Sequence, residues 1–87
     1  MKIKSGFVVR EIAGESVVIA LGEASKIFNG IIKLNGTGRI IWDSIAEGKE
    51  RDAIIEAILT EYEIDKNTVE TDVDNFIAKL KGANIIE

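Results

Sequence analysis

The stretch from residue 28 to residue 42, FNGIIKLNGTGRIIW, marks a change in the character of the chain. Residues before it have the pattern of strands, and residues after it have the pattern of helices. Within the stretch, residues 31–34 form a short apolar run with one lysine between two Asn-Gly pairs, which is typical of a short strand between turns. A chain of this kind must join a small sheet to a helical half at this point.

The second Asn-Gly pair, which begins at Asn35, allows two structures. Asn-Gly between two apolar runs is the strongest short-range hairpin signal, so residues 39–42 can return as a strand. Against this, residues 40–42 are three consecutive apolar residues and Ile45 follows them at helix spacing, which breaks strict alternation and fits one side of a helix. In the helical interpretation Asn35 is the N-cap and Gly48 follows the last turn.

The strands of the sheet are expected in the first half of the chain. Residues 7–12 and 16–21 are rich in β-branched side chains and are separated by Ala-Gly-Glu, so they predict a hairpin with a three-residue loop at residues 13–15. Residues 31–34 supply a third strand, in which Lys33 marks the wetter face. The sequence places this third strand at the edge of the sheet.

The second half of the chain is expected to be helical. Apolar residues at helix spacing predict a helix from about residue 50 to residue 62. The next helix begins near residue 65 or 67, where Asn67 is the expected cap, and ends at Gly82. The apolar tail at residues 83–86 is expected to pack on the core, and Trp42 is interpreted as a core residue. Strands followed by helices are typical of an α+β fold.

The composition excludes several classes of chemistry. The chain contains no cysteine and no histidine, so thiol nucleophiles, imidazole bases, disulfides and the usual zinc or iron–sulfur ligand sets are missing. Asp72 and Asp74 point about 200° apart on a helix, so they cannot share a metal or a proton and are interpreted as solvated. The sequence predicts a single domain over residues 1–87, with no catalytic activity, metal or cofactor.

Hydropathy and charge limit the partners. No apolar run approaches the roughly 18 residues of a membrane span, so the sequence predicts a cytoplasmic protein with no membrane partner. Residues 49–87 carry five basic and ten acidic side chains, and the last helix has three of each, whereas a helix that reads DNA needs a basic face. Nucleic acid is therefore not an expected partner, although a winged-helix transcriptional regulator remains an alternative class.

The ordered set of motifs resembles the PqqD family, the small proteins named for pyrroloquinoline quinone biosynthesis, whose domain is also called a RiPP precursor-peptide recognition element. The likeness covers essentially the whole chain, and no single motif carries it alone. The residues that carry it are Gly6-Phe7, Arg10-Glu11, the turn from Leu34 to Gly38, Trp42, Glu47-Gly48, the link from Tyr62 to Asp65, Asp72-Val73, Leu80 and Gly82-Ala83.

The resemblance implies a three-stranded antiparallel sheet followed by three helices, in a winged helix-turn-helix-like arrangement without DNA binding, and it favours the helix after Asn35. It also implies that the chain binds the leader segment of a ribosomally synthesised precursor peptide and presents it to a modifying enzyme, often a radical S-adenosylmethionine (SAM) protein. The leader would add to the third strand and lie against the third helix. The implied peptide-binding residues are Ile31, Ile32, Lys33, Leu34, Val69, Val73, Phe76, Ile77 and Leu80.

The residues themselves are compatible with this function. An edge strand with one lysine and no proline leaves its backbone donors and acceptors available to an added peptide strand. Ile77, at the margin of the apolar stripe of the last helix, is the residue expected to open onto a groove. A homodimer formed through the same strand edge is the competing interpretation, because an unpaired edge accepts a second copy equally well.

Overall fold

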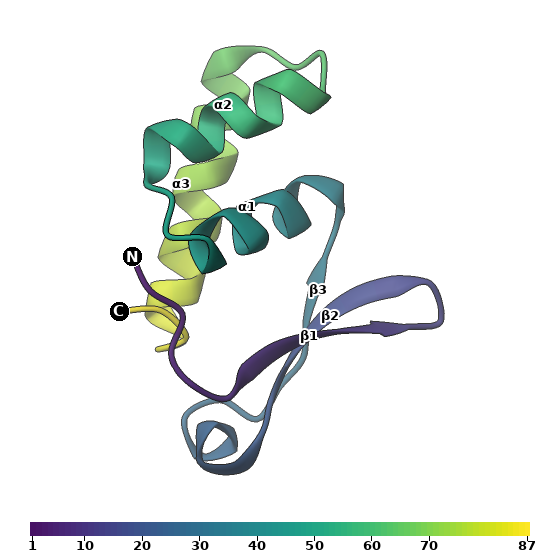
Figure 1. Cartoon of the computed structure of the whole chain (residues 1–87), viewed down its shortest axis with the longest axis vertical. Helices are drawn as coiled ribbons and strands as arrows, with labels where there is room; N and C mark the ends of the chain where they lie inside the picture. The colour runs from purple at the N-terminus through teal and green to yellow at the C-terminus, as the bar shows by residue number, and fades with distance from the viewer.

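The computed structural model describes all 87 residues of the chain. A three-stranded antiparallel sheet is followed by three helices, which confirms the α+β prediction. Figure 1 shows the sheet to one side and the helices stacked beside it, with β3 leading directly into α1. The elements in chain order are β1 (Phe7–Ile12), β2 (Glu15–Ala20), the short 3₁₀ helix η1 (Gly22–Lys26), β3 (Ile32–Leu34), α1 (Gly36–Ala46), α2 (Arg51–Glu61) and α3 (Lys66–Gly82).

The β1–β2 hairpin turns through two residues, so the predicted three-residue loop is wrong. Ile12 pairs with Glu15, and the two residues between them have positive φ angles, 52° at Ala13 and 81° at Gly14. Two positive φ values are the requirement of a type I′ turn, which matches the twist of the flanking strands. Glu15, the third residue of the predicted loop, is therefore the first residue of β2.

The strand β3 is an edge strand, as predicted, because the sheet order is β1-β2-β3. It begins at Ile32, one residue later than expected, and the preceding Ile31 has 62% of its surface exposed. Ile32 and Leu34 are buried at 4% and 7% exposure, and the side chain of Lys33 between them is exposed. The period of two therefore places one apolar face of β3 in the core.

The chain is helical after Asn35, so the helix prediction is confirmed and the returning strand is wrong. The side chain of Asn35 caps α1 by accepting a hydrogen bond of 2.8 Å from the Gly38 N–H. At the other end, Gly48 follows the helix with a φ of 85°, a value that favours glycine. Trp42 has only 4% of its surface exposed and is the core residue that the sequence predicts.

The cap of α3 differs from the predicted one. Asp65, rather than Asn67, is the N-cap, and its carboxylate accepts a hydrogen bond of 3.3 Å from the Thr68 N–H. Asn67 lies inside the first turn, because the extended backbone needed at a cap occurs at Asp65. Gly82 is the last residue of the helix, and the left-handed turn that reverses the chain occurs at Asn84, where φ is 61°.

The C-terminal tail packs on the core, as predicted. Ile85 and Ile86 have 0% and 4% of their surface exposed, and Ile86 pairs with Ile3 in an isolated bridge. The Lys4 N–H donates to the Ile85 carbonyl oxygen at 2.8 Å. The two ends of the chain are thus fixed to each other beside the end of α3.

None of the helices is long and apolar enough to cross a bilayer.

Candidate functional site

The open edge of β3 presents backbone groups of one residue, Lys33. The Leu21 N–H donates to the Gly6 carbonyl oxygen at 2.8 Å, in register with the β1–β2 ladder. Since successive residues of an antiparallel strand turn their N–H and C=O to opposite sides, this bond fixes which β2 residues turn toward β3. By the observed register, Ile32 and Leu34 bond to β2, and Lys33 turns its N–H and C=O away from the sheet.

The side chains of β3 divide between the core and the solvent. Ile32 and Leu34, two of the implied binding residues, belong to the hydrophobic core and are covered by the helices. The ammonium group of Lys33 lies 3.6 Å from the Glu15 carboxylate, with both side chains largely exposed. Ile31 lies outside the strand and is exposed. The backbone of β3, rather than its buried side chains, is therefore what a binding partner can reach.

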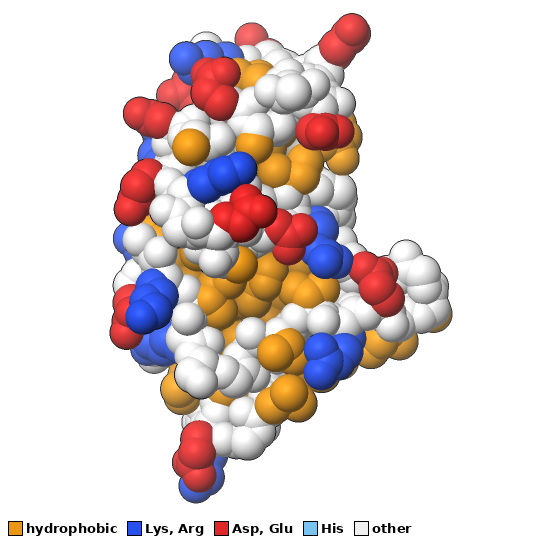
Figure 2. All heavy atoms as spheres, viewed as in Figure 1, with side chains coloured by type: hydrophobic (Ala, Val, Ile, Leu, Met, Phe, Trp, Pro, Cys, Tyr) orange, Lys and Arg blue, Asp and Glu red, His pale blue; other side chains and the backbone are white.

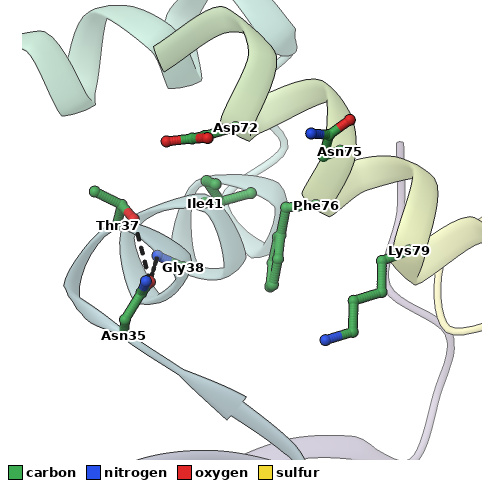
Figure 3. Close-up of a pocket in the computed structure, with 8 residues that line it drawn as sticks. All are labelled: Asn35, Thr37, Gly38, Ile41, Asp72, Asn75, Phe76 and Lys79. Atoms are coloured by element: carbon green, nitrogen blue, oxygen red, sulfur yellow. Dashed lines mark hydrogen bonds between the residues drawn. The ribbon is translucent and has the colours of Figure 1, made fainter. Parts of the chain in front are cut away.

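A cavity of about 320 Å³ opens beside the end of β3, between α1 and α3. Figure 3 shows the side chains of Asp72, Phe76 and Lys79 spread along α3, with Asp72 nearest the start of α1 and Lys79 at the far end beyond the Phe76 ring. Ile41 and Phe76 are its apolar residues, and the rest of the lining is polar. We call this cavity the α1–α3 groove; its lining residues are Asn35, Thr37, Gly38, Ile41, Asp72, Asn75, Phe76 and Lys79.

Of the five α3 residues implied as peptide-binding, only Phe76 lines the groove. Val69, Val73 and Leu80 have 1% or less of their surface exposed, so they support the groove from within the core. Ile77 is half-buried against the core but is not part of the lining. Phe76 therefore faces the α1–α3 groove, whereas the half-buried Ile77 lies outside its lining. The contact of either residue with a peptide stays a prediction.

Sequence reasoning missed the polar part of the groove. Asp72, Asn75 and Lys79 follow one another at intervals of three and four residues, which places them with Phe76 on one face of α3. This spacing is visible in the sequence, but it does not indicate a groove unless the position of α1 opposite α3 is known. Thr37 completes the far side, where its hydroxyl donates to the Asn35 side-chain oxygen at 3.1 Å.

A second depression lies between the N-terminal segment and α1. Its volume is about 630 Å³, and Phe7, Trp42 and Ile45 contribute to its lining. Figure 2 shows hydrophobic side chains gathered in a hollow below α1, in the region between this helix and the sheet. These three side chains are at most 6% exposed, so the depression exposes only the margin of the core. Phe7 begins β1, which is the other edge strand of the sheet, so a backbone edge adjoins this depression as well.

An ion-pair network fixes α3 against α2. The Arg51 guanidinium donates to both carboxylate oxygens of Asp74, at 2.6 and 3.0 Å, and to Glu70 at 3.5 Å. These hydrogen bonds raise the pKa of Arg51 and hold the pKa of the Asp74 carboxyl below its ordinary value, against a smaller opposing effect of desolvation. Asp74 is thus paired across the helices instead of simply solvated, whereas Asp72 remains free beside the groove.

A similar network fixes α1 against the hairpin. The Arg39 guanidinium donates to Asp43 at 3.0 Å, to Glu11 at 2.9 Å and to the Ser16 hydroxyl at 3.1 Å. The hydrogen bond to Asp43 is the main reason that the pKa of Arg39 is raised. Because Arg39 lies one turn beyond the Asn35 cap, it holds the start of α1, and with it one wall of the groove, in place over the sheet.

These features define a class of protein: a small α+β domain that presents a free strand edge next to an apolar-floored groove. Its side chains include no group of three or more His, Cys, Asp or Glu arranged to hold a metal ion. A family model described as coenzyme PQQ synthesis protein D (PqqD) matches residues 8–86. The chain belongs to the PqqD family, whose members are peptide-binding domains and not enzymes.

Two solved structures resemble the chain over nearly its whole length. TbiB1 in complex with the TbiA(beta) leader peptide is 32% identical, with a TM-score of 0.79, and the match covers 100% of this chain and 95% of that one. Lasso peptide synthetase B1 complexed with the leader peptide is 19% identical, with a TM-score of 0.76 over 98% of this chain and 93% of that one, and supports the fold alone. No curated protein matches the chain at a significant level.

Proposed function

We propose that this chain binds the leader segment of a ribosomally synthesised precursor peptide and presents it to a modifying enzyme. The leader adds as a fourth strand on β3 and places one apolar side chain in the α1–α3 groove. The observation that carries the proposal is the juxtaposition of an outward-facing backbone at Lys33 with a groove floored by Ile41 and Phe76. Strand addition supplies affinity through the main chain, and pockets beside it supply specificity.

The energetics require both elements. Each backbone hydrogen bond contributes roughly 0.5 to 1.5 kcal/mol net, and a strand as short as β3 offers few of them. Ordering an extended peptide costs about as much as these bonds return. An apolar side chain buried in the groove adds about 1.5 to 3 kcal/mol. We expect affinity in the micromolar to high nanomolar range, with losses when either the edge or the groove is altered.

Family membership supports the choice of partner. The PqqD family is named for the synthesis of a coenzyme, and TbiB1, 32% identical to this chain, was solved with a leader peptide bound. We propose that the partner enzyme is of the radical SAM class, because the family resemblance implies such enzymes as recipients of the leader. Copurification of the chain with a candidate enzyme, in the presence and absence of the precursor, tests this part separately.

The test of peptide binding is a proline at the outward-facing position. Lys33→Pro removes the free N–H without removing a bond between β2 and β3, and edge strands tolerate proline when its nitrogen faces solvent. Lys33→Ala is the matched control, because it removes the side chain and keeps the N–H. The probes are the TbiA(beta) leader peptide and the N-terminal segments of short peptides encoded beside this gene, titrated into ¹⁵N-labelled protein.

Leader binding should shift the amide resonances of residues 31–35 and 72–79. We expect Lys33→Pro to weaken binding about tenfold, since one hydrogen bond is lost and the local strand angle changes, and Lys33→Ala to change it less than twofold. Shifts confined to β1 and β2, or equal affinity of the proline and alanine variants, would refute strand addition at β3. Sedimentation with and without peptide distinguishes this from a homodimer, in which the added strand comes from a second copy.

A further inference from the structure

Two charged side chains of the α1–α3 groove have no partner within the protein. Asp72 and Lys79 both line the groove, and neither takes part in any ion pair. Neither has an oppositely charged residue three or four positions away on α3, where helical ion pairs form. On the opposite side of the same helix, Asp74 and Glu70 are both bound by Arg51. Lys66 and Lys81 of α3 also lack an ion pair, but neither lines the groove. Asp72 and Lys79 are therefore the unpaired charges of α3 that a peptide in the groove can meet.

The two charges lie at opposite ends of the groove, with Phe76 between them. Figure 3 shows Asp72 above Thr37 at the start of α1, and Lys79 at the other end of the labelled set, beyond the Phe76 ring. Seven residues of helix at about 1.5 Å each separate Asp72 from Lys79 along the axis by about 10 Å. In a strand, side chains that share a face recur about every 6.6 Å, so three successive positions of one face span this groove.

The direction of an added strand follows from the sheet. All neighbouring strands are antiparallel, and antiparallel pairing is slightly more stable than parallel pairing. Figure 1 shows that β3 runs toward the start of α1 while α3 runs the opposite way. A strand antiparallel to β3 therefore runs along α3 from Asp72 toward Lys79.

We infer that Asp72 and Lys79 select a leader peptide in which a basic residue, an apolar residue and an acidic residue follow at positions i, i+2 and i+4. This inference rests on the proposed function and names the chemistry that the groove takes. The basic residue meets Asp72, the apolar residue packs on Ile41 and Phe76, and the acidic residue meets Lys79. The start of α1 also faces Asp72, but a helix terminus carries only about half a positive charge, so the carboxylate dominates.

The same arrangement rejects other peptides. A leader with the charges reversed, or one that runs parallel to β3, would place like charges together at both ends of the groove. Like charges repel about as strongly as opposite charges attract. The difference in binding free energy between the matched peptide and the charge-reversed peptide is therefore about twice the free energy of the ion pairs alone. The charge pair thereby sets the direction of the peptide, which backbone hydrogen bonding alone does not determine.

Two synthetic probes of identical composition test this inference. The first is acetyl-Ser-Thr-Lys-Thr-Leu-Thr-Glu-Thr-Ser-amide, and the second exchanges its Lys and Glu. We expect the wild-type protein to bind the first probe about tenfold more tightly, because two exposed ion pairs replace two repulsions. The double variant Asp72→Lys with Lys79→Asp should reverse the preference. In 1 M NaCl, where the screening length is about 3 Å, both preferences should disappear.

The single variant Lys79→Asp should lose the preference for the first probe. Its matched control is Lys81→Asp, which changes the net charge of α3 by the same amount at a residue outside the groove lining. This control should keep the wild-type preference. Equal affinity for the two probes, with amide shifts in β3 and the groove, would overturn the charge rule and leave the proposed function standing. No shift at these residues with either probe or with the TbiA(beta) leader would overturn both.

Discussion

Replacing Phe76 by alanine should weaken leader binding far more than replacing Ile77 by alanine. The two residues are neighbours on α3, both are half-buried, and both pack against the core. Full removal of a buried large side chain costs about 2 to 5 kcal/mol, so at half burial each variant should lose a similar 1 to 2 kcal/mol of folding free energy. Only Phe76 lines the groove, and this difference isolates the binding contribution.

The loss of affinity follows from the geometry of the groove. An apolar leader side chain gains about 1.5 to 3 kcal/mol on burial, and in the proposed complex it would contact the two apolar residues of the groove, Ile41 and Phe76. Removing the ring should forfeit roughly half of this gain, about 1 to 1.5 kcal/mol, which corresponds to fivefold to tenfold weaker binding. Ile77→Ala should stay within twofold of wild type.

Fluorescence anisotropy with labelled TbiA(beta) leader peptide measures the binding, and thermal unfolding of the same preparations measures the stability. The measurements should be made well below both melting temperatures, so that the folded fraction does not differ. Equal losses of affinity in the two variants would refute the assignment of Phe76 to the groove. A larger loss for Ile77→Ala would show that the peptide lies on the other side of α3.

Three further predictions concern the fold that supports the site. Trp42→Ala should cost about 3 to 5 kcal/mol of unfolding free energy, measured by urea denaturation, because a buried aromatic is removed; unchanged stability would place the ring outside the core. Ala13→Asn should stabilise by about 1 kcal/mol, because asparagine tolerates the positive φ that alanine adopts before Gly14; a lower melting temperature would contradict the type I′ turn. Asp74 has a folded pKa below its ordinary 3.8, so its pairing with Arg51 stabilises the protein above that value and is lost as the pH falls through the lower folded pKa. Asp74→Asn should therefore melt below wild type at pH 6, and the gap should close as the pH falls through the lowered folded pKa of Asp74. A gap independent of pH would show that the ion pair contributes nothing.

The sequence predicts helices and strands well where nearby side chains determine the local backbone structure. The alternation of Ile32, Lys33 and Leu34 gives the buried and the wet face of β3 locally. The residues after Asn35 allow either a helix or a returning strand, and the family resemblance is what favours α1. The hairpin turn was misplaced because alanine at positive φ is disfavoured locally, and the pairing of the two strands overrides that preference at Ala13. Local signals thus fail where a tertiary contact determines the backbone.

The groove could be predicted only in part. The apolar stripe of α3 is visible as a period, but the period does not say which neighbour each residue meets. Val73 and Leu80 lie in the core, Phe76 faces α1, and Ile77 lies about 100° further around the helix. The packing of α1 against α3, which brings residues 35–41 opposite residues 72–79, depends on the whole fold.

The short length of β3 has a consequence for where a bound precursor would be modified. With only Lys33 turned outward, a leader strand that slips by two residues keeps the same backbone hydrogen bonds and the same facing side. Such a slip would move every downstream residue by about 7 Å, which is enough to present the wrong residue to an enzyme. In the proposed complex, the apolar side chain on Phe76 and the charges that meet Asp72 and Lys79 would therefore fix the register of the leader. The number of residues between that apolar side chain and the modified position should then be constant among the precursors that bind.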